Sequence, residues 1–264
     1  MREREILFVG QLVDVAAYPT GRAFARVDTA EGALEYLRAG GPEPELIVLA
    51  QSRPGEFASL TIDALRRAVP LARFERVAGT WCEGEQRSGR PLAGCTNHYW
   101  HQWPVRFLRE LGRARAGQCP DWGLPQTTTV DERLLKNTRS PLTRGSGTVV
   151  ICARQAAAAS ALAEVCQLGG YTTQIVREDL DWQATGALAV VWDTTPERLA
   201  DVEGVARIRR AADDVALVAV VGFPRRADVQ LAQQAGVDAV VSKPYAIRDL
   251  LSELARVAVP TSVP

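Results

Sequence analysis

Short apolar runs alternate with amphipathic segments along most of this 264-residue chain. The apolar runs, such as "EILFV" and "LIVLA", are rich in branched side chains, which is typical of strands buried on both faces. The segments between them carry apolar residues three or four positions apart, which is typical of helices packed on a sheet. This alternation predicts an α/β fold, in which helices cover both faces of a parallel sheet.

The first half of the chain contains this pattern in a shortened form. Strands are expected at residues 5–10, 23–28, 45–50, 73–79 and 97–103. Helices are expected at residues 29–41, 61–69 and 104–116.

The second half repeats the pattern. Strands are expected at residues 148–153, 171–176, 187–193, 216–222 and 237–243. Helices are expected at residues 155–170, 201–212, 225–236 and 245–257. The two halves also share a register, because Gly10 and Ala50 are 40 positions apart, as are Ala153 and Asp193. We therefore predict two tandem domains of one fold.

The predicted domains are residues 1–116 and residues 148–264. Residues 117–147 contain prolines and a Gly-Ser-Gly sequence, so we interpret them as a solvated linker.

Each predicted domain lacks one helix. The first has little room for a helix after its first strand, where Pro19 and Gly21 interrupt a short segment. The second carries "EDLDWQATG" (178–186) in place of most of its second helix. We expect the linker, the other domain or a second chain to cover the apolar strip that the first missing helix would leave.

Charge and composition narrow the classes of function. Lys and Arg together number 31, as do Asp and Glu, so we expect no direct nucleic-acid binding and no attraction to anionic membranes. No apolar run is long enough to cross a membrane, and we find no secretory signal. We therefore expect a cytoplasmic protein whose five cysteines are free thiols.

The second half resembles the receiver (CheY-like) domain of bacterial response regulators. The resemblance lies in "VVWDTTP" (190–196) and in "VAVVGFPRRADVQLAQQAGVDAVVSKPYAIRDLL" (217–251). The first half resembles the same family more weakly, through residues 27–57. The resemblance implies two doubly wound, flavodoxin-like domains, each with a five-stranded parallel sheet in the order 2-1-3-4-5. It also implies that ligand chemistry lies at the carboxyl ends of the strands.

The resemblance further implies a phosphotransfer site, which the second half keeps only in part. Asp193 matches the phosphoacceptor and Lys243 matches the lysine that contacts the phosphoryl group. The magnesium-binding acid pair is replaced by Ala153 and Arg154, and Gly222 stands where the family has a hydroxyl. We hypothesise that Arg154 or Lys243 pairs with Asp193 in place of a metal ion. In the alternative, Asp193 caps the loop that follows it.

The first half keeps no residue of this site. The corresponding positions hold Val9, Gly10, Gln11, Ala50, Gly79 and Trp103.

Residues 81–103, "WCEGEQRSGRPLAGCTNHYWHQW", allow three interpretations. The first is a metal site made by Cys82, Cys95, His98 and His101. The second is an active site in which a histidine activates Cys82. If residues 97–103 form a strand, His98 and His101 point to opposite faces, which disfavours the metal site. We predict no metal and no cofactor.

The third interpretation is a loop that binds a partner or a ligand, because glycines and Pro91 break the helix expected there. Trp and Arg are favoured at protein interfaces. Its candidate residues are Trp81, Cys82, Glu83, Glu85, Arg87, Arg90, His98, Trp100 and Trp103. In the alternative, the rings only fill space, with Trp103 plugging the emptied phosphate pocket.

These observations predict a non-enzymatic signalling or scaffold protein that acts by phosphorylation-independent protein contacts. Its partner would be a histidine kinase or a regulatory protein. The resemblance to receiver domains also implies a homodimer through residues 104–116 and 245–257. The alternatives are a ligand sensor or enzyme that uses residues 81–103, and a response regulator still phosphorylated on Asp193.

Overall fold

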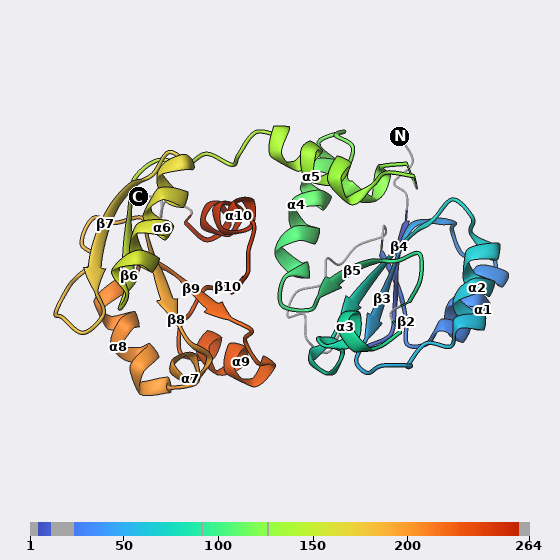
Figure 1. Cartoon of the computed structure of the whole chain (residues 1–264), viewed down its shortest axis with the longest axis horizontal. Coiled ribbons are helices and arrows are strands. Elements are labelled where there is room, and N and C mark those ends of the chain that lie inside the picture. Colours follow the sequence, from blue (N-terminus) through green and yellow to red (C-terminus); the bar gives the residue numbers. More distant parts are fainter. Residues whose placement is uncertain (1–4, 12–23, 91, 126, 259–264) are drawn as a thin grey trace. The chain divides into compact units, whose positions relative to one another are not determined.

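The computed structural model describes residues 5–11, 24–90, 92–125 and 127–258. The chain divides into two compact units, residues 1–127 and 128–264, and each is described here by itself (Figure 1).

The first unit is built around a five-stranded sheet whose strands are all parallel, in the order β2-β1-β3-β4-β5. Its strands are β1 (Glu5–Val9), β2 (Phe24–Val27), β3 (Pro44–Gln51), β4 (Arg73–Ala78) and β5 (Thr96–Tyr99). Its helices are α1 (Ala30–Arg38), α2 (Ser59–Ala68), η1 (Thr80–Cys82), α3 (Glu85–Ser88), α4 (Trp103–Arg115) and η2 (Asp121–Gly123).

The second unit has a sheet of the same kind, in the order β7-β6-β8-β9-β10. Its strands are β6 (Thr148–Ala153), β7 (Thr172–Arg177), β8 (Ala189–Thr194), β9 (Ala216–Gly222) and β10 (Ala239–Lys243). Its helices are α5 (Val130–Arg139), α6 (Ala156–Leu168), α7 (Pro196–Leu199), α8 (Val202–Ala212), α9 (Arg226–Gln234) and α10 (Ile247–Val257). Both sheets thus have the strand order 2-1-3-4-5, which confirms the predicted fold class.

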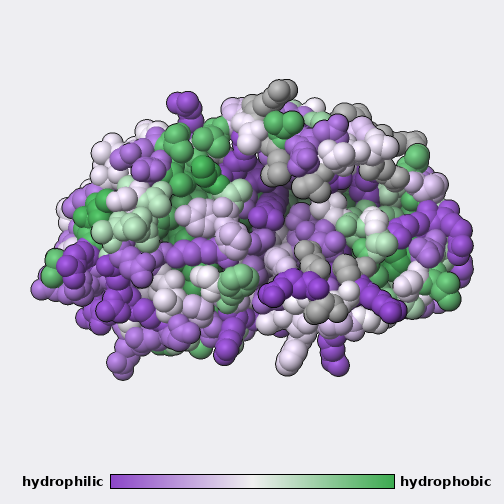
Figure 2. Space-filling model, in the orientation of Figure 1, coloured by the Kyte–Doolittle hydropathy of each residue, from purple (hydrophilic) through white to green (hydrophobic). Residues whose placement is uncertain are grey.

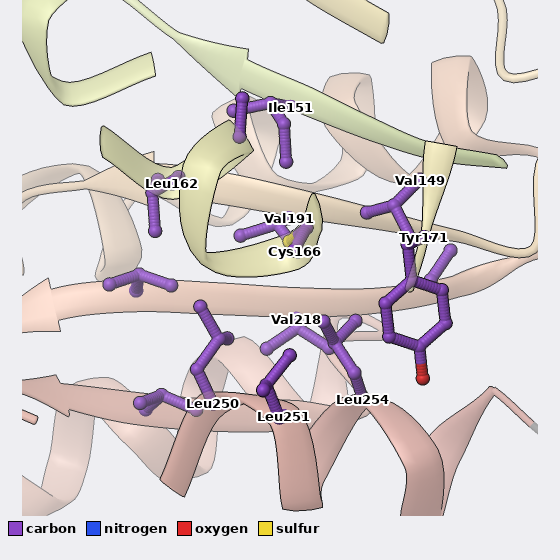
Figure 3. Packing of buried hydrophobic residues seen from close by; sticks show 14 of the residues in the cluster. Val149, Ile151, Leu162, Cys166, Tyr171, Val191, Val218, Leu250, Leu251 and Leu254 are labelled. Atoms are coloured by element: carbon purple, nitrogen blue, oxygen red, sulfur yellow. The ribbon is translucent and has the colours of Figure 1, made fainter. Parts of the chain in front are cut away.

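Alternation along the strands divides each core between the two faces of its sheet. In the second unit, Val149 and Ile151 face α6 and α10 (Figure 3), while Val150 and Cys152 face α7, α8 and α9. In the first unit, Leu7 and Val9 face α1 and α2. The next residue in the alternation, Phe8, meets α4 through edge-on contacts with Trp103 and Phe107, at 6.1 and 5.9 Å between ring centroids.

The segment that we interpreted as a linker is more ordered than a solvated tether. Trp122 is buried, stacks on Phe107 at 5.8 Å, and donates from Nε1 to Glu45 Oε1 at 3.1 Å. Arg73 also donates to the backbone carbonyl of Trp122 at 3.2 Å. The next part forms α5, whose first turn is closed by a capping box between Thr129 and Glu132.

The structure tests only one of the two predictions of a missing helix. Residues 178–186 form no helix, as predicted. The segment between β1 and β2 lies largely outside the described residues, so the missing first helix and the covered strip stay predictions.

Polar residues cover most of the face seen in Figure 2, and hydrophobic residues gather on it in separate patches. Within the described parts of the chain, no helix combines the length and the hydropathy that a membrane span requires.

Candidate functional site

The carboxyl edge of the second sheet holds an ion pair between Asp193 and Lys243. Asp193 is the second-last residue of β8, and Lys243 is the last residue of β10, with β9 between them. Lys243 Nζ donates to Asp193 Oδ1, and the Asp193 side chain is 15% exposed. Burial and the nearby Asp193 carboxylate raise the pKa of Tyr245 to about 12, so the phenol stays neutral beside this pair.

Of the two cations that we proposed as partners for Asp193, the structure pairs it with Lys243. Arg154 is exposed, and its charge acts instead on Asp179 and Arg198. Magnesium needs several oxygen ligands. Among the described residues, no group of three or more Asp, Glu, His or Cys side chains is placed to hold a metal ion.

In the first unit, the end of β1 packs closely against β3 and Phe57. Gly10 has a positive φ of 94°, and a Cβ added there would lie 2.5 Å from the Ala50 carbonyl oxygen and 3.3 Å from the Phe57 ring. Only glycine fits this close approach of β1 to β3. The buried ring of Phe57 therefore packs beside the end of β1.

The prediction that Trp103 plugs the emptied phosphate pocket is wrong. Trp103 is the first residue of α4, because β5 ends at Tyr99 and Pro104 starts the helix. Its ring is 1% exposed and stacks on Phe107 at 4.4 Å. Its Nε1 donates to Oε2 of Glu75, in the middle of β4, at 3.0 Å. Trp103 therefore belongs to the core beneath α4 and not to the edge of the sheet.

The candidate residues of the 81–103 loop divide between the two faces of the first sheet. On the α3 side, the fully buried guanidinium of Arg76 pairs with Glu85 and donates to Gln51 and to Asn97 Oδ1, the last at 3.1 Å. On the α4 side, Nε2 of His98 lies 3.7 Å from Oε1 of Glu75.

Electrostatics differ between these two faces. Burial raises the pKa of Glu75, but His98 and the hydrogen bond from Trp103 outweigh it, so the net pKa lies below the usual value. Cys82 lies on the Arg76 side, where its thiol contacts the Gln51 carbonyl oxygen at 3.6 Å. Cys82 and His98 therefore cannot form a nucleophile and base pair from opposite faces.

Burial also disfavours the reactive thiolate form of Cys82. It is 0% exposed, and desolvation raises its pKa despite the nearby Arg76. Treatment of the folded protein with N-ethylmaleimide, followed by peptide mass spectrometry, should label exposed Cys119 first. Cys82 should react only after denaturation, and rapid labelling of Cys82 in the native protein would support the catalytic interpretation instead.

His101 gives the first unit a sensitivity to acid. Burial and nearby Arg106 lower its pKa from 6.5 to about 4, and its ring stacks on Tyr99 at 5.7 Å. Below pH 6.5 the unfolded chain binds a proton at His101, whereas the folded chain binds this proton only near pH 4. The folded state should therefore lose up to about 3 kcal/mol as the pH falls through this window. Urea denaturation at pH 7 and pH 4.5 gives the loss in the free energy of unfolding between these two pH values. This loss should be smaller for His101→Phe than for the wild type, and equal losses would contradict the prediction.

The remaining candidates differ in their access to solvent. Trp81 is 82% exposed, and Arg87 and Arg90 are also exposed. Glu83 is half-buried, whereas Trp100 is buried. Of these candidates, only Trp81, Arg87 and Arg90 have exposed side chains that a partner can contact.

Sequence reasoning missed the buried polar network around Arg76 and the ion pair between Glu178 and Arg198 in the second unit. A signal for the first was present. "RFERVA" (73–78) places charges inside a strand between two others, and buried charges need partners.

No protein-family profile matches the chain, and no curated protein matches it. Solved structures do match, among them three that each cover less than half of the chain. A CheY-like response regulator protein from Mesorhizobium loti is 17% identical with a TM-score of 0.37, covering 44% of this chain and 100% of that chain. A CheY-like receiver domain protein from Methanospirillum hungatei is 17% identical with a TM-score of 0.34, covering 43% and 94%.

A response regulator from Thermotoga maritima is 14% identical with a TM-score of 0.35, covering 43% of this chain and 98% of that chain. These matches concern the fold alone. The strand order 2-1-3-4-5 of both sheets confirms the resemblance to receiver domains at that level.

Proposed function

We propose that this chain is a signal-transduction protein that acts through protein contacts and without phosphoryl transfer. The observation that carries the proposal is the Asp193–Lys243 ion pair, with Ala153 and Arg154 at the positions of the magnesium-binding acids. A carboxylate held by a lysine, with alanine and arginine in place of the acid pair, lacks the ligands that bring magnesium and a phosphoryl group to it.

The loop at residues 81–103 is the proposed contact surface of the first unit. Trp81 is exposed, while its neighbour Cys82 is fully buried and Glu85 is tied to Arg76. Buried polar contacts of this kind fix a loop in one conformation more than they add stability. A large ring held outward on such a loop is suited to fill a pocket of a partner.

The partners would be proteins, and the expected class is a histidine kinase or another regulatory protein. A second copy of this chain is a further expected partner. Cross-linked capture from cells of the source organism tests this with three versions of the chain. The wild type and Asp193→Asn should capture the same partner, and Trp81→Ala should lose it. A partner held by the wild type and lost by Asp193→Asn would favour phosphorylation-dependent signalling.

A further inference from the structure

A groove of about 530 Å³ lies in the second unit where the missing second helix leaves residues 178–186 as a loop. The loop forms one wall, with Leu180, Asp181 and Trp182, and α8 forms the other, with Arg207 and Arg210. This volume is within the usual range of binding sites, about 300–1,000 Å³.

The loop wall is fixed at both ends. At its start, the buried carboxylate of Glu178 accepts two hydrogen bonds from the guanidinium of Arg198 on α7. Near its end, Ala184 N donates to the Ala211 carbonyl oxygen at 2.9 Å, which ties the loop to the last turn of α8. The groove is therefore preformed, which reduces the entropy that a ligand must overcome on binding.

The charge along the groove is positive. Arg198 neutralises Glu178, which leaves Asp181 against the exposed Arg207 and Arg210. Burial, and then the nearby positive charges of Arg154 and Arg207, lower the pKa of Arg198, as expected where guanidinium groups crowd together. Guanidinium groups bind carboxylates through paired hydrogen bonds, so the groove suits an acidic ligand.

The loop wall of the groove begins directly after β7, which lies at the edge of the sheet. Among the described residues β7 pairs only with β6, so its other edge has unpaired backbone groups. Arg177 is the only charge in this six-residue strand, and Ile175 is 51% exposed on it. Leu180, three residues beyond the strand, is 60% exposed at the groove. An edge with so little protection can accept a further strand from a partner.

We propose that the edge of β7 and this groove together bind an extended acidic segment of a partner protein. The segment would add to β7 as a strand, place carboxylates against Arg207 and Arg210, and lay one large apolar side chain beside Trp182. The inference rests on the proposed function, because it names the chemistry of one partner. A nucleotide could use the same arginines but would leave the edge of β7 unused.

The test is selection of random twelve-residue peptides displayed on phage against the full-length protein. The enriched peptides should be rich in Asp and Glu and carry at least one large apolar residue. Their affinity, measured by fluorescence polarisation, should fall about tenfold or more for Arg207→Gln/Arg210→Gln. The matched control, Arg53→Gln/Arg67→Gln at exposed positions of the first unit outside the 81–103 loop, should leave it unchanged. Amide exchange at residues 172–177 should slow when a selected peptide binds.

Several results would overturn the inference. The selection could enrich no peptides, or it could enrich peptides without an excess of Asp and Glu. The peptide affinity could be unchanged in Arg207→Gln/Arg210→Gln, or the amides of β7 could exchange as fast with the peptide bound as without it. If ATP binds to the protein and no acidic peptide competes with it, the groove would be assigned to a small molecule. Loss of peptide binding in Arg87→Gln/Arg90→Gln alone would place the contact on the 81–103 loop, so the proposed function would stand while the groove proposal fell.

Discussion

Replacing Glu85 by alanine should lower the free energy of unfolding of the first unit by about 3–5 kcal/mol. Its partner Arg76 is 0% exposed and would then hold a buried positive charge without a counter-charge. Gln51 and Asn97 would still accept hydrogen bonds from Arg76, but neither carries a negative charge. Breaking a buried ion pair by removing one partner costs more than the pair itself contributes, because the remaining charge stays desolvated.

Amide hydrogen exchange, read by mass spectrometry, assigns this loss to the first unit, since peptides from each unit are measured separately. The matched control is Arg87→Ala, in the same short helix but exposed, which should change stability by no more than about 0.5 kcal/mol. The double variant Arg76→Met/Glu85→Ala should be more stable than Glu85→Ala, because it removes the unpaired charge. If Glu85→Ala behaved like Arg87→Ala, the buried network would not hold the loop.

Replacing Trp103 by alanine should destabilise the first unit by a similar amount, about 3–5 kcal/mol. The change removes a buried ring that contacts both Phe8 and Phe107, and it leaves a cavity beneath α4. It also removes the hydrogen bond to the carboxylate of Glu75, which is itself buried. Trp103→Phe keeps an aromatic ring and loses the hydrogen bond, so it should cost about 1–3 kcal/mol.

Trp81→Ala is the matched control for Trp103, because it makes the same substitution at a ring that is 82% exposed. It should change stability by no more than about 0.5 kcal/mol while removing the proposed partner contact. The two tryptophans thus separate the two roles that the sequence left open for the loop, filling of space and contact with a partner. A large loss of stability in Trp81→Ala, or none in Trp103→Ala, would reverse these roles.

Periodicity was sufficient to predict parallel sheets covered by helices, because buried parallel strands are continuously apolar and the helices are amphipathic. The strand order came from the resemblance to receiver domains. The predicted strands 148–153 and 216–222 coincide with β6 and β9. The resemblance to receiver domains identified Asp193 and Lys243, and the hypothesis of their pairing agrees with the structure.

The 81–103 segment was harder to predict because its structure depends on tertiary contacts. The sequence "NHYWHQW" looks like a continuous strand, but only residues 96–99 form β5, and a turn at Trp100 and His101 leads into α4. The strand ends at Tyr99, so Trp103 does not lie at the end of β5 and does not plug the pocket there as predicted. Likewise, nothing local to Phe57 indicates that its ring reaches Gly10 across the sheet.

Incubation of the protein with magnesium and acetyl phosphate, followed by intact-protein mass spectrometry, tests most directly whether this chain works without phosphoryl transfer. A receiver domain with a complete acid pair serves as the positive control, and Asp193→Asn serves as the negative one. We predict that the wild type keeps its unmodified mass while the positive control gains a phosphoryl group. A hydroxylamine-sensitive phosphoryl group on Asp193 of the wild type, absent from Asp193→Asn, would contradict the proposed function.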